Sequence, residues 1–91
     1  MLKFKNGQEF DGANVTEQML FRDGVPYGWL FTATLTGDIT SESINELFAE
    51  QNITEITYGN VIITGYDNVN SAVLYYAEDG VRIDIQLSKG V

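Results

Sequence analysis

The sequence predicts an α+β fold in which an antiparallel sheet of about six to eight strands, built from hairpins, is combined with one helix at about residues 40–51. Three observations lead to this prediction. Apolar and polar residues alternate along several short segments, glycine-containing turn pairs separate those segments, and a single stretch has helical spacing. With 91 residues, 44% of them hydrophobic, the chain is long enough for one domain, residues 1–91. We expect the sheet to curl into a small sandwich or barrel.

The helix is predicted from Ile39–Gln51. Thr40 is a suitable N-cap, because its hydroxyl can accept a hydrogen bond from a backbone N–H of the first turn. Apolar residues fall on one side of this helix: Ile44, Leu47 and Phe48. Carboxylates four residues apart fall on the opposite side: Glu42, Glu46 and Glu50. A helix of about three turns is unstable alone in water, so we expect its apolar side to pack on the strands.

Two hairpins are predicted before the helix. Asn6-Gly7 favours a tight turn within Leu2–Phe10, and Asp11-Gly12 is expected to end that strand. Two longer strands follow at Val15–Phe21 and Tyr27–Leu35, with residues 22–26 as their connection. Because Tyr27–Leu35 alternates with one strongly aromatic face, we predict it as the central strand.

Two more hairpins are predicted after the helix. Ile53–Tyr58 and Val61–Tyr66 flank Gly59-Asn60, and a two-residue loop there gives the register Tyr58–Val61 and Ile56–Ile63. After a polar connection at Asp67–Asn70, the last hairpin pairs Ala72–Ala77 with Val81–Leu87 around Asp79-Gly80. One of its faces is apolar: Ala72, Leu74, Tyr76, Ile83, Ile85 and Leu87. The other face is mixed: Val73, Tyr75, Arg82, Asp84 and Gln86.

The composition argues against an enzyme. The chain contains neither cysteine nor histidine, which excludes disulfides, thiolate nucleophiles and the commonest general base and metal ligand. Its serines therefore have no histidine to activate them, and no glycine-rich phosphate loop is present. The segment Asp67–Ser71 places Val69 where a calcium loop needs an oxygen ligand. We predict no catalytic activity, no cofactor and no bound metal.

The charge distribution is strongly one-sided. Thirteen acidic and five basic residues give a net charge of −8, which disfavours direct binding to nucleic-acid phosphates. Between Arg22 and Arg82 the chain has no lysine or arginine, and the predicted helix lies in the middle of this interval. Two interpretations remain open for the carboxylates at Glu42, Glu46 and Glu50. They form an ordinary solvated face, which the sequence favours, or they contact a basic protein surface.

Further candidate partner contacts are aromatic and apolar. Tyr75 and Val73 lie on the outward face of the last predicted hairpin, and Tyr66 is a candidate for the same apolar patch. A place in the core or on an ordinary sheet surface is the alternative for the aromatic residues. Edge strands also offer pairing with a strand of a neighbouring subunit.

No targeting segment is predicted. The start MLKFKNGQEF lacks the long apolar region of a signal peptide, and no run reaches the roughly 18 apolar residues that a membrane span requires. We therefore expect no signal peptide and no contact with a membrane.

Several stretches resemble small proteins encoded in the tail gene modules of phages and prophages of Gram-positive bacteria. These are the start KFKNGQEF, the segment SINELFAEQNITEIT, Gly65-Tyr66 and the closing IDIQLSKG. The resemblance implies a structural or tail-assembly protein that binds copies of itself or another tail component, first in the host cytoplasm and then in the virion. The alternative is an acidic inhibitor that binds the basic nucleic-acid groove of a host defence nuclease.

Overall fold

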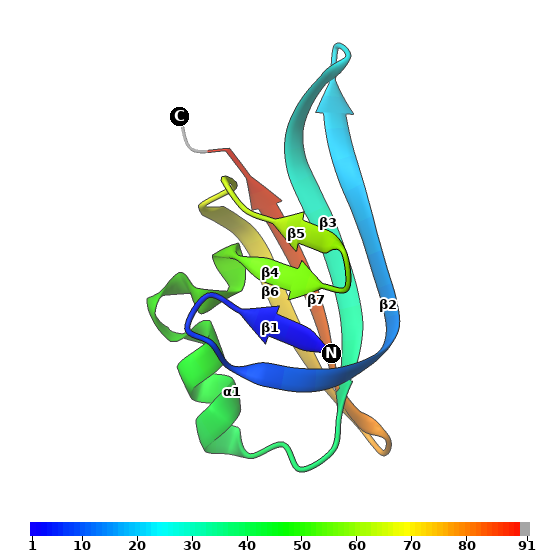
Figure 1. Ribbon diagram of the computed structural model, residues 1–91, viewed down its shortest axis with the longest axis vertical. Helices are drawn as coiled ribbons and strands as arrows, with labels where there is room; N and C mark the ends of the chain where they lie inside the picture. The colour runs from blue at the N-terminus through cyan, green and yellow to red at the C-terminus, as the bar shows by residue number, and fades with distance from the viewer. Residues whose placement is uncertain (90–91) are drawn as a thin grey trace.

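The described part of the chain folds into one seven-stranded antiparallel sheet with a single α-helix, as the sequence predicts (Figure 1). The computed structural model describes residues 1–89, without the side chains of residues 50 and 51. Along the chain the elements are β1 (Leu2–Phe4), β2 (Glu9–Arg22), β3 (Val25–Thr36), α1 (Ser41–Phe48), the 3-10 helix η1 (Ala49–Thr54), β4 (Ile56–Tyr58), β5 (Val61–Ile63), β6 (Asn68–Ala77) and β7 (Gly80–Ser88). The strand order in the sheet is β5-β4-β1-β2-β3-β7-β6.

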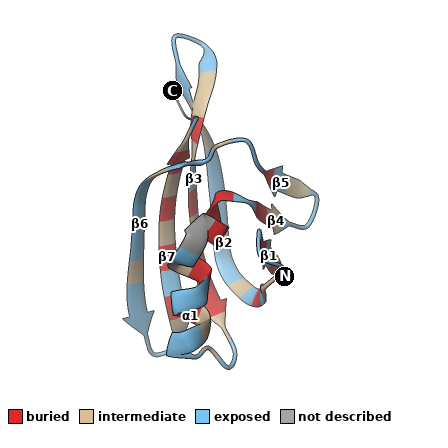
Figure 2. Cartoon of the chain, turned by 90° about the vertical axis from the view of Figure 1, so that its left-hand side faces the viewer, coloured by how far each residue is buried: buried red, intermediate tan, exposed pale blue. Residues whose placement is uncertain are grey.

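The long strand β2 bends the sheet into two layers. Its first residues, Glu9 and Phe10, pair with β1, and the rest of the strand from Asp11 to Arg22 pairs with β3. The short strands β1, β4 and β5 therefore lie across the layer formed by β2, β3, β7 and β6, and α1 with η1 closes one open side (Figures 1 and 2). This is the small sandwich-like arrangement that the sequence predicts.

The core lies between these layers. Buried residues alternate with polar residues along β7, where the buried members are Val81, Ile83, Ile85 and Leu87. They meet Phe31, Ala33 and Leu35 of β3 on the same face, because β3 and β7 pair directly. The short strands and the helix cover this face with Leu2, Phe4, Ile44, Leu47, Ile53, Ile56 and Ile63.

The helix begins where predicted but ends earlier. Thr40 is the N-cap, and Thr40 and Ser43 form a capping box in which each side chain bonds the other residue's backbone N–H. The α-helical turns stop at Phe48, and the prediction of a helix to residue 51 is wrong in its last turn. The 3-10 turns that follow bury Asn52 and Ile53, and the Asn52 amide donates to the Glu46 carbonyl at 2.9 Å. The chain changes here from α-helical to 3-10 geometry, and the 3-10 turns place Ile53 in the core.

The described residues form the four predicted hairpins, with revised boundaries. Gly59-Asn60 gives the predicted register Tyr58–Val61 and Ile56–Ile63, but these strands span only Ile56–Tyr58 and Val61–Ile63. The connection between β2 and β3 narrows to Asp23-Gly24, whose φ angles of +51° and +79° are those of a type I′ turn.

Two predicted interruptions are strand. Asp11 and Gly12 do not end β2, because they pair with Thr36 and Leu35. The pairing becomes irregular only after Ala13, where Asn14 has a φ angle of +52°. The polar connection predicted at Asp67–Asn70 is strand from Asn68 onward. There the Asn68 amide donates to Asn70 Oδ1 at 2.8 Å and to Ser88 Oγ at 3.0 Å, so these polar side chains satisfy one another along the strand.

Candidate functional site

Strand β6 forms one edge of the sheet, and most of its residues are exposed (Figure 2). Within residues 1–89, β7 is the only strand that pairs with it. Its outer edge therefore presents backbone N–H and C=O groups that another strand can pair with. We define the β6 edge as this ten-residue strand, Asn68–Ala77.

The outer face of the β6 edge carries two of the predicted contact residues. Val73 and Tyr75 are both exposed, Tyr75 by 51%. Tyr75 lies opposite Arg82 of β7, whose guanidinium sits 6.0 Å from the centre of the tyrosine ring. The same guanidinium bonds Asp84 at 3.1 Å, so the positive charge next to Tyr75 is already paired. This face therefore offers an aliphatic and an aromatic side chain beside a neutralised ion pair.

The opposite face of the β6 edge is only partly buried. Its three residues Ala72, Leu74 and Tyr76 share the face of Ile83 and Ile85, as the sequence indicates, but only Leu74 packs against the core. Tyr76 is 72% exposed, and Ala72 is also exposed. A face of an edge strand is buried only where another layer covers it, and the covering layer does not reach Tyr76. Alternation along the strand does not reveal this exposure, so Tyr76 could not be predicted as a contact residue.

The other free edges of the sheet are protected. From Asp11 onward, β2 pairs only with β3 among the described strands, but its free edge carries Asp11, Glu17 and Arg22 and is interrupted between Ala13 and Thr16. At the far end of the sheet, β5 has only three residues. Charges, irregularities and short length are the devices that keep edges from pairing. β6 has no charged residue and no proline, and its one irregularity, between Val69 and Ser71, leaves Ser71–Ala77 in unbroken register.

Tyr66 does not join this surface. Its ring packs edge-on against Trp29, with ring centroids 6.4 Å apart, and the Lys89 ammonium lies 5.6 Å from the ring centre. Trp29 shares the core-facing side of β3 with Phe31, whereas Val73 and Tyr75 point to the opposite side of the sheet. The structure therefore brings Val73 and Tyr75 together and places Tyr66 elsewhere.

The acidic side of the helix is only partly described. Glu42 and Glu46 are exposed on α1, while the side chain of Glu50 lies outside the described residues. The α-helical spacing ends at Phe48, so within α1 the column of carboxylates consists of Glu42 and Glu46.

A second exposed apolar feature is the projecting end of the β2–β3 hairpin, which extends beyond the rest of the sheet (Figure 1). Phe21 and Val25 are exposed near its tip, by 58% and 60%. The Arg22 guanidinium lies 4.9 Å from the centre of the Tyr27 ring, which holds the tip's charge against the hairpin. In the sequence these residues resemble any other strand residues. Only the length of β2 and β3 beyond β7 shows that they project.

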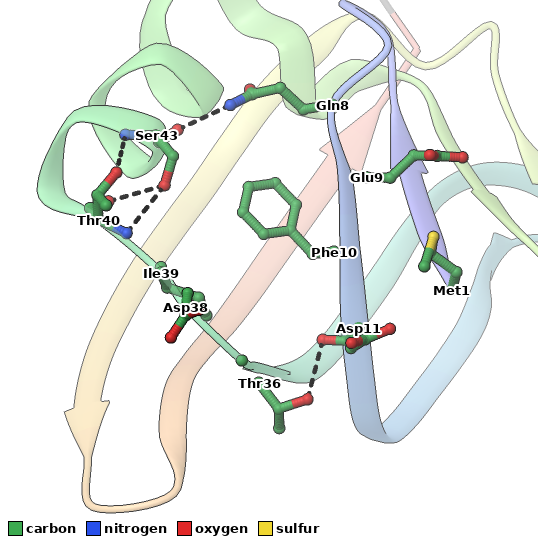
Figure 3. A pocket seen from close by; sticks show the side chains of 11 residues that line it. Met1, Gln8, Glu9, Phe10, Asp11, Thr36, Asp38, Ile39, Thr40 and Ser43 are labelled. Atoms are coloured by element: carbon green, nitrogen blue, oxygen red, sulfur yellow. Dashed lines mark hydrogen bonds between the residues drawn. The ribbon is translucent and has the colours of Figure 1, made fainter.

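A hollow of about 330 Å³ opens where α1 begins, between β2 and the segment Thr36–Thr40 (Figure 3). Its polar groups serve the fold: the Gln8 amide donates to the Ser43 carbonyl at 3.1 Å, and the Thr36 hydroxyl donates to the Asp11 carbonyl at 3.4 Å. The first bond fastens the start of α1 to the residue just before β2, and the second joins the end of β3 to β2. The hollow lies at the junction between α1 and the sheet.

Among the described side chains, no group of three or more Asp or Glu residues is placed to hold a metal ion. The helices in the described part of the chain are too short and too polar to cross a bilayer.

Comparisons with known proteins add no relative. No protein-family model, no curated protein and no solved structure matches the chain.

Proposed function

We propose that this protein is a non-enzymatic structural or assembly component of a phage virion or tail, acting through protein–protein contacts. The observation that carries the proposal is the uncharged, exposed β6 edge, in a sheet whose other free edges are short or charged. A partner strand added to such an edge gains main-chain hydrogen bonds, and alternate side chains give it specificity. The resemblance of the sequence to tail-module proteins supports the setting, with assembly in the host cytoplasm.

The contact side chains follow from the strand's two faces. Val73 and Tyr75 lie on one face and Tyr76 on the other, and aromatic side chains are enriched in protein interfaces. The partner is another copy of the chain or a second tail protein.

Inhibition of a host defence nuclease is the second candidate function. Glu42 and Glu46 are exposed on α1, as this function requires. Two carboxylates one helical turn apart are sparse beside nucleic acid, which carries one charge per roughly 1.7 Å of duplex axis. The β6 edge has no part in this alternative, so the two functions depend on different surfaces.

A matched pair of variants tests the proposed function. Tyr76→Lys and Ile62→Lys each replace a large exposed apolar side chain, 72% and 63% exposed, with a lysine, and they lie on opposite edges of the sheet. The purified chain, alone and with each product of the neighbouring genes, is followed by size exclusion with light scattering. We expect a larger assembly that Tyr76→Lys disrupts and Ile62→Lys preserves.

One set of results would favour nuclease inhibition over the assembly function. A strict monomer that co-migrates with none of these products, but blocks DNA binding by a nuclease, overturns the assembly function. Loss of that inhibition on changing Glu42 and Glu46 to lysine would then assign it to the acidic face of α1.

A further inference from the structure

We infer that the occupant of the β6 edge is the β6 edge of a second copy of this chain, paired antiparallel about a two-fold axis at Leu74. This inference rests on the proposed function and names its partner. The two sheets then join into one continuous sheet through identical strands.

Charge selects a second copy as the partner. The chain carries a net charge of −8, so two copies repel each other over most of their surfaces. Asn68–Ala77 contains no Asp, Glu, Lys or Arg. Two acidic molecules can therefore meet at this strand without bringing like charges into contact. A basic partner would instead be attracted to the carboxylates elsewhere. An uncharged edge on an acidic molecule therefore suits another acidic molecule.

The acidic turn after β6 selects the antiparallel direction. Glu78 and Asp79 connect β6 to β7, immediately beyond Ala77. Parallel pairing would bring the two turns together, with four carboxylates at one end. Antiparallel pairing places each turn at the opposite end of the interface, where Glu78 lies across from Asn70 of the second copy.

The side chains select the register. A two-fold axis at Leu74 pairs all seven residues of the regular stretch, Ser71–Ala77, with the same stretch of the second copy. Val73 then lies opposite Tyr75 on one face, and Ala72 lies opposite Tyr76 on the other. Each pair joins a small or β-branched residue to an aromatic ring, and such cross-strand pairs stabilise a sheet. Tyr76, largely exposed in the single chain, gains a neighbour on the partner strand.

Cysteine cross-linking tests this register directly, because the chain has no cysteine of its own. Ala72 and Tyr76 are both exposed, so Ala72→Cys and Tyr76→Cys leave the fold intact. Residues directly opposite each other in an antiparallel pair have Cα atoms about 4.5–5.5 Å apart. That separation lies within the range of about 4.4–6.8 Å that a disulfide spans.

The two variants are mixed under reducing conditions and then oxidised with copper phenanthroline. We expect the mixture to give a disulfide-linked dimer, and each variant alone to give less than about a tenth as much, since residue 72 does not face residue 72 of the partner. A mixture of Ile62→Cys with Tyr76→Cys is the matched control. Equal cross-linking in the control shows random collision and overturns the inference, as does a wild-type chain that stays monomeric in light scattering.

Different results would refute self-pairing and the assembly function. A monomeric wild-type chain that still binds a neighbouring gene product, with Tyr76→Lys abolishing that binding, refutes self-pairing and leaves the assembly function standing. A dimer without the Ala72–Tyr76 cross-link refutes this register and axis.

Discussion

At Gly28 the backbones of β3 and β7 lie so close together that they leave no room for a side chain. A Cβ atom at this position would lie 2.4 Å from the Leu87 carbonyl oxygen, because β3 and β7 approach closely where Gly28 faces Ser88. That oxygen belongs to the backbone of a buried strand and has little freedom to move. A side chain of any size at residue 28 must therefore push the two strands apart.

Replacing Gly28 with alanine tests this fit. We expect the free energy of unfolding to fall by about 1–3 kcal/mol, the usual cost of overpacking, measured by urea denaturation. Gly12→Ala is the control, because its Cβ would meet Leu2 Cδ1, a side-chain methyl, at 2.8 Å. The Gly12 loss should be smaller, since a leucine side chain can adjust its torsion angles more easily than a strand backbone can shift. Equal losses at the two positions would contradict the role given to the Leu87 carbonyl.

The helix α1 depends on its first turn for local stability. It has no basic residue in its last turn, so the capping box of Thr40 and Ser43 is its main terminal stabilisation. The cap also adjoins the bond from Gln8 to Ser43, which ties the helix to the residue just before β2. Loss of the cap should therefore lower the stability of the whole fold.

Thr40→Ala should lower the free energy of unfolding by about 0.5–2 kcal/mol, since it removes the acceptor for the Ser43 N–H. Thr40→Asp is the matched variant: its carboxylate accepts the same bond and should keep most of the stability. Chemical denaturation followed by circular dichroism measures both. An unchanged midpoint for Thr40→Ala would show that packing of Ile44 and Leu47 alone holds the helix.

At the scale of the whole molecule, net charge and shape act together. The chain is elongated, 41 × 25 × 23 Å, with the β2–β3 hairpin projecting from one end. Its net charge of −8 opposes self-association at long range, while the uncharged β6 edge permits it at contact. Dissolved salt screens the long-range repulsion between copies but does not change the contact through the uncharged β6 edge.

We therefore expect self-association to strengthen as salt rises from low to physiological concentration, because a Debye length of about 30 Å at 0.01 M shortens to about 8 Å at 0.15 M. Sedimentation equilibrium at several salt concentrations measures the dissociation constant. Binding of the acidic face to a basic partner would weaken over the same range. A dissociation constant for self-association that increases with salt would contradict pairing through an uncharged edge.

The sequence by itself determined the elements of this protein. Alternation along β3 and β7, the turn at Gly59-Asn60 and the N-cap at Thr40 are local signals, so the fold class, a strand register and the start of the helix could be predicted. The end of the helix could not, because the 3-10 turns form to place Ile53 in the core. Nor could the unbroken course of β2, whose pairing with β3 overrides the turn signal at Asp11-Gly12.

The tertiary structure decided which residues make up the candidate site. Tyr66, Tyr75 and Tyr76 have the same side chain in similar strand-like sequence, yet Tyr66 packs on Trp29 while Tyr75 and Tyr76 are exposed on the β6 edge. Alternation assigns a residue to a face of its strand, but the strand order places β6 at the edge and the second layer decides which face is covered. Exposure at the β6 edge is therefore a property of the assembled sheet.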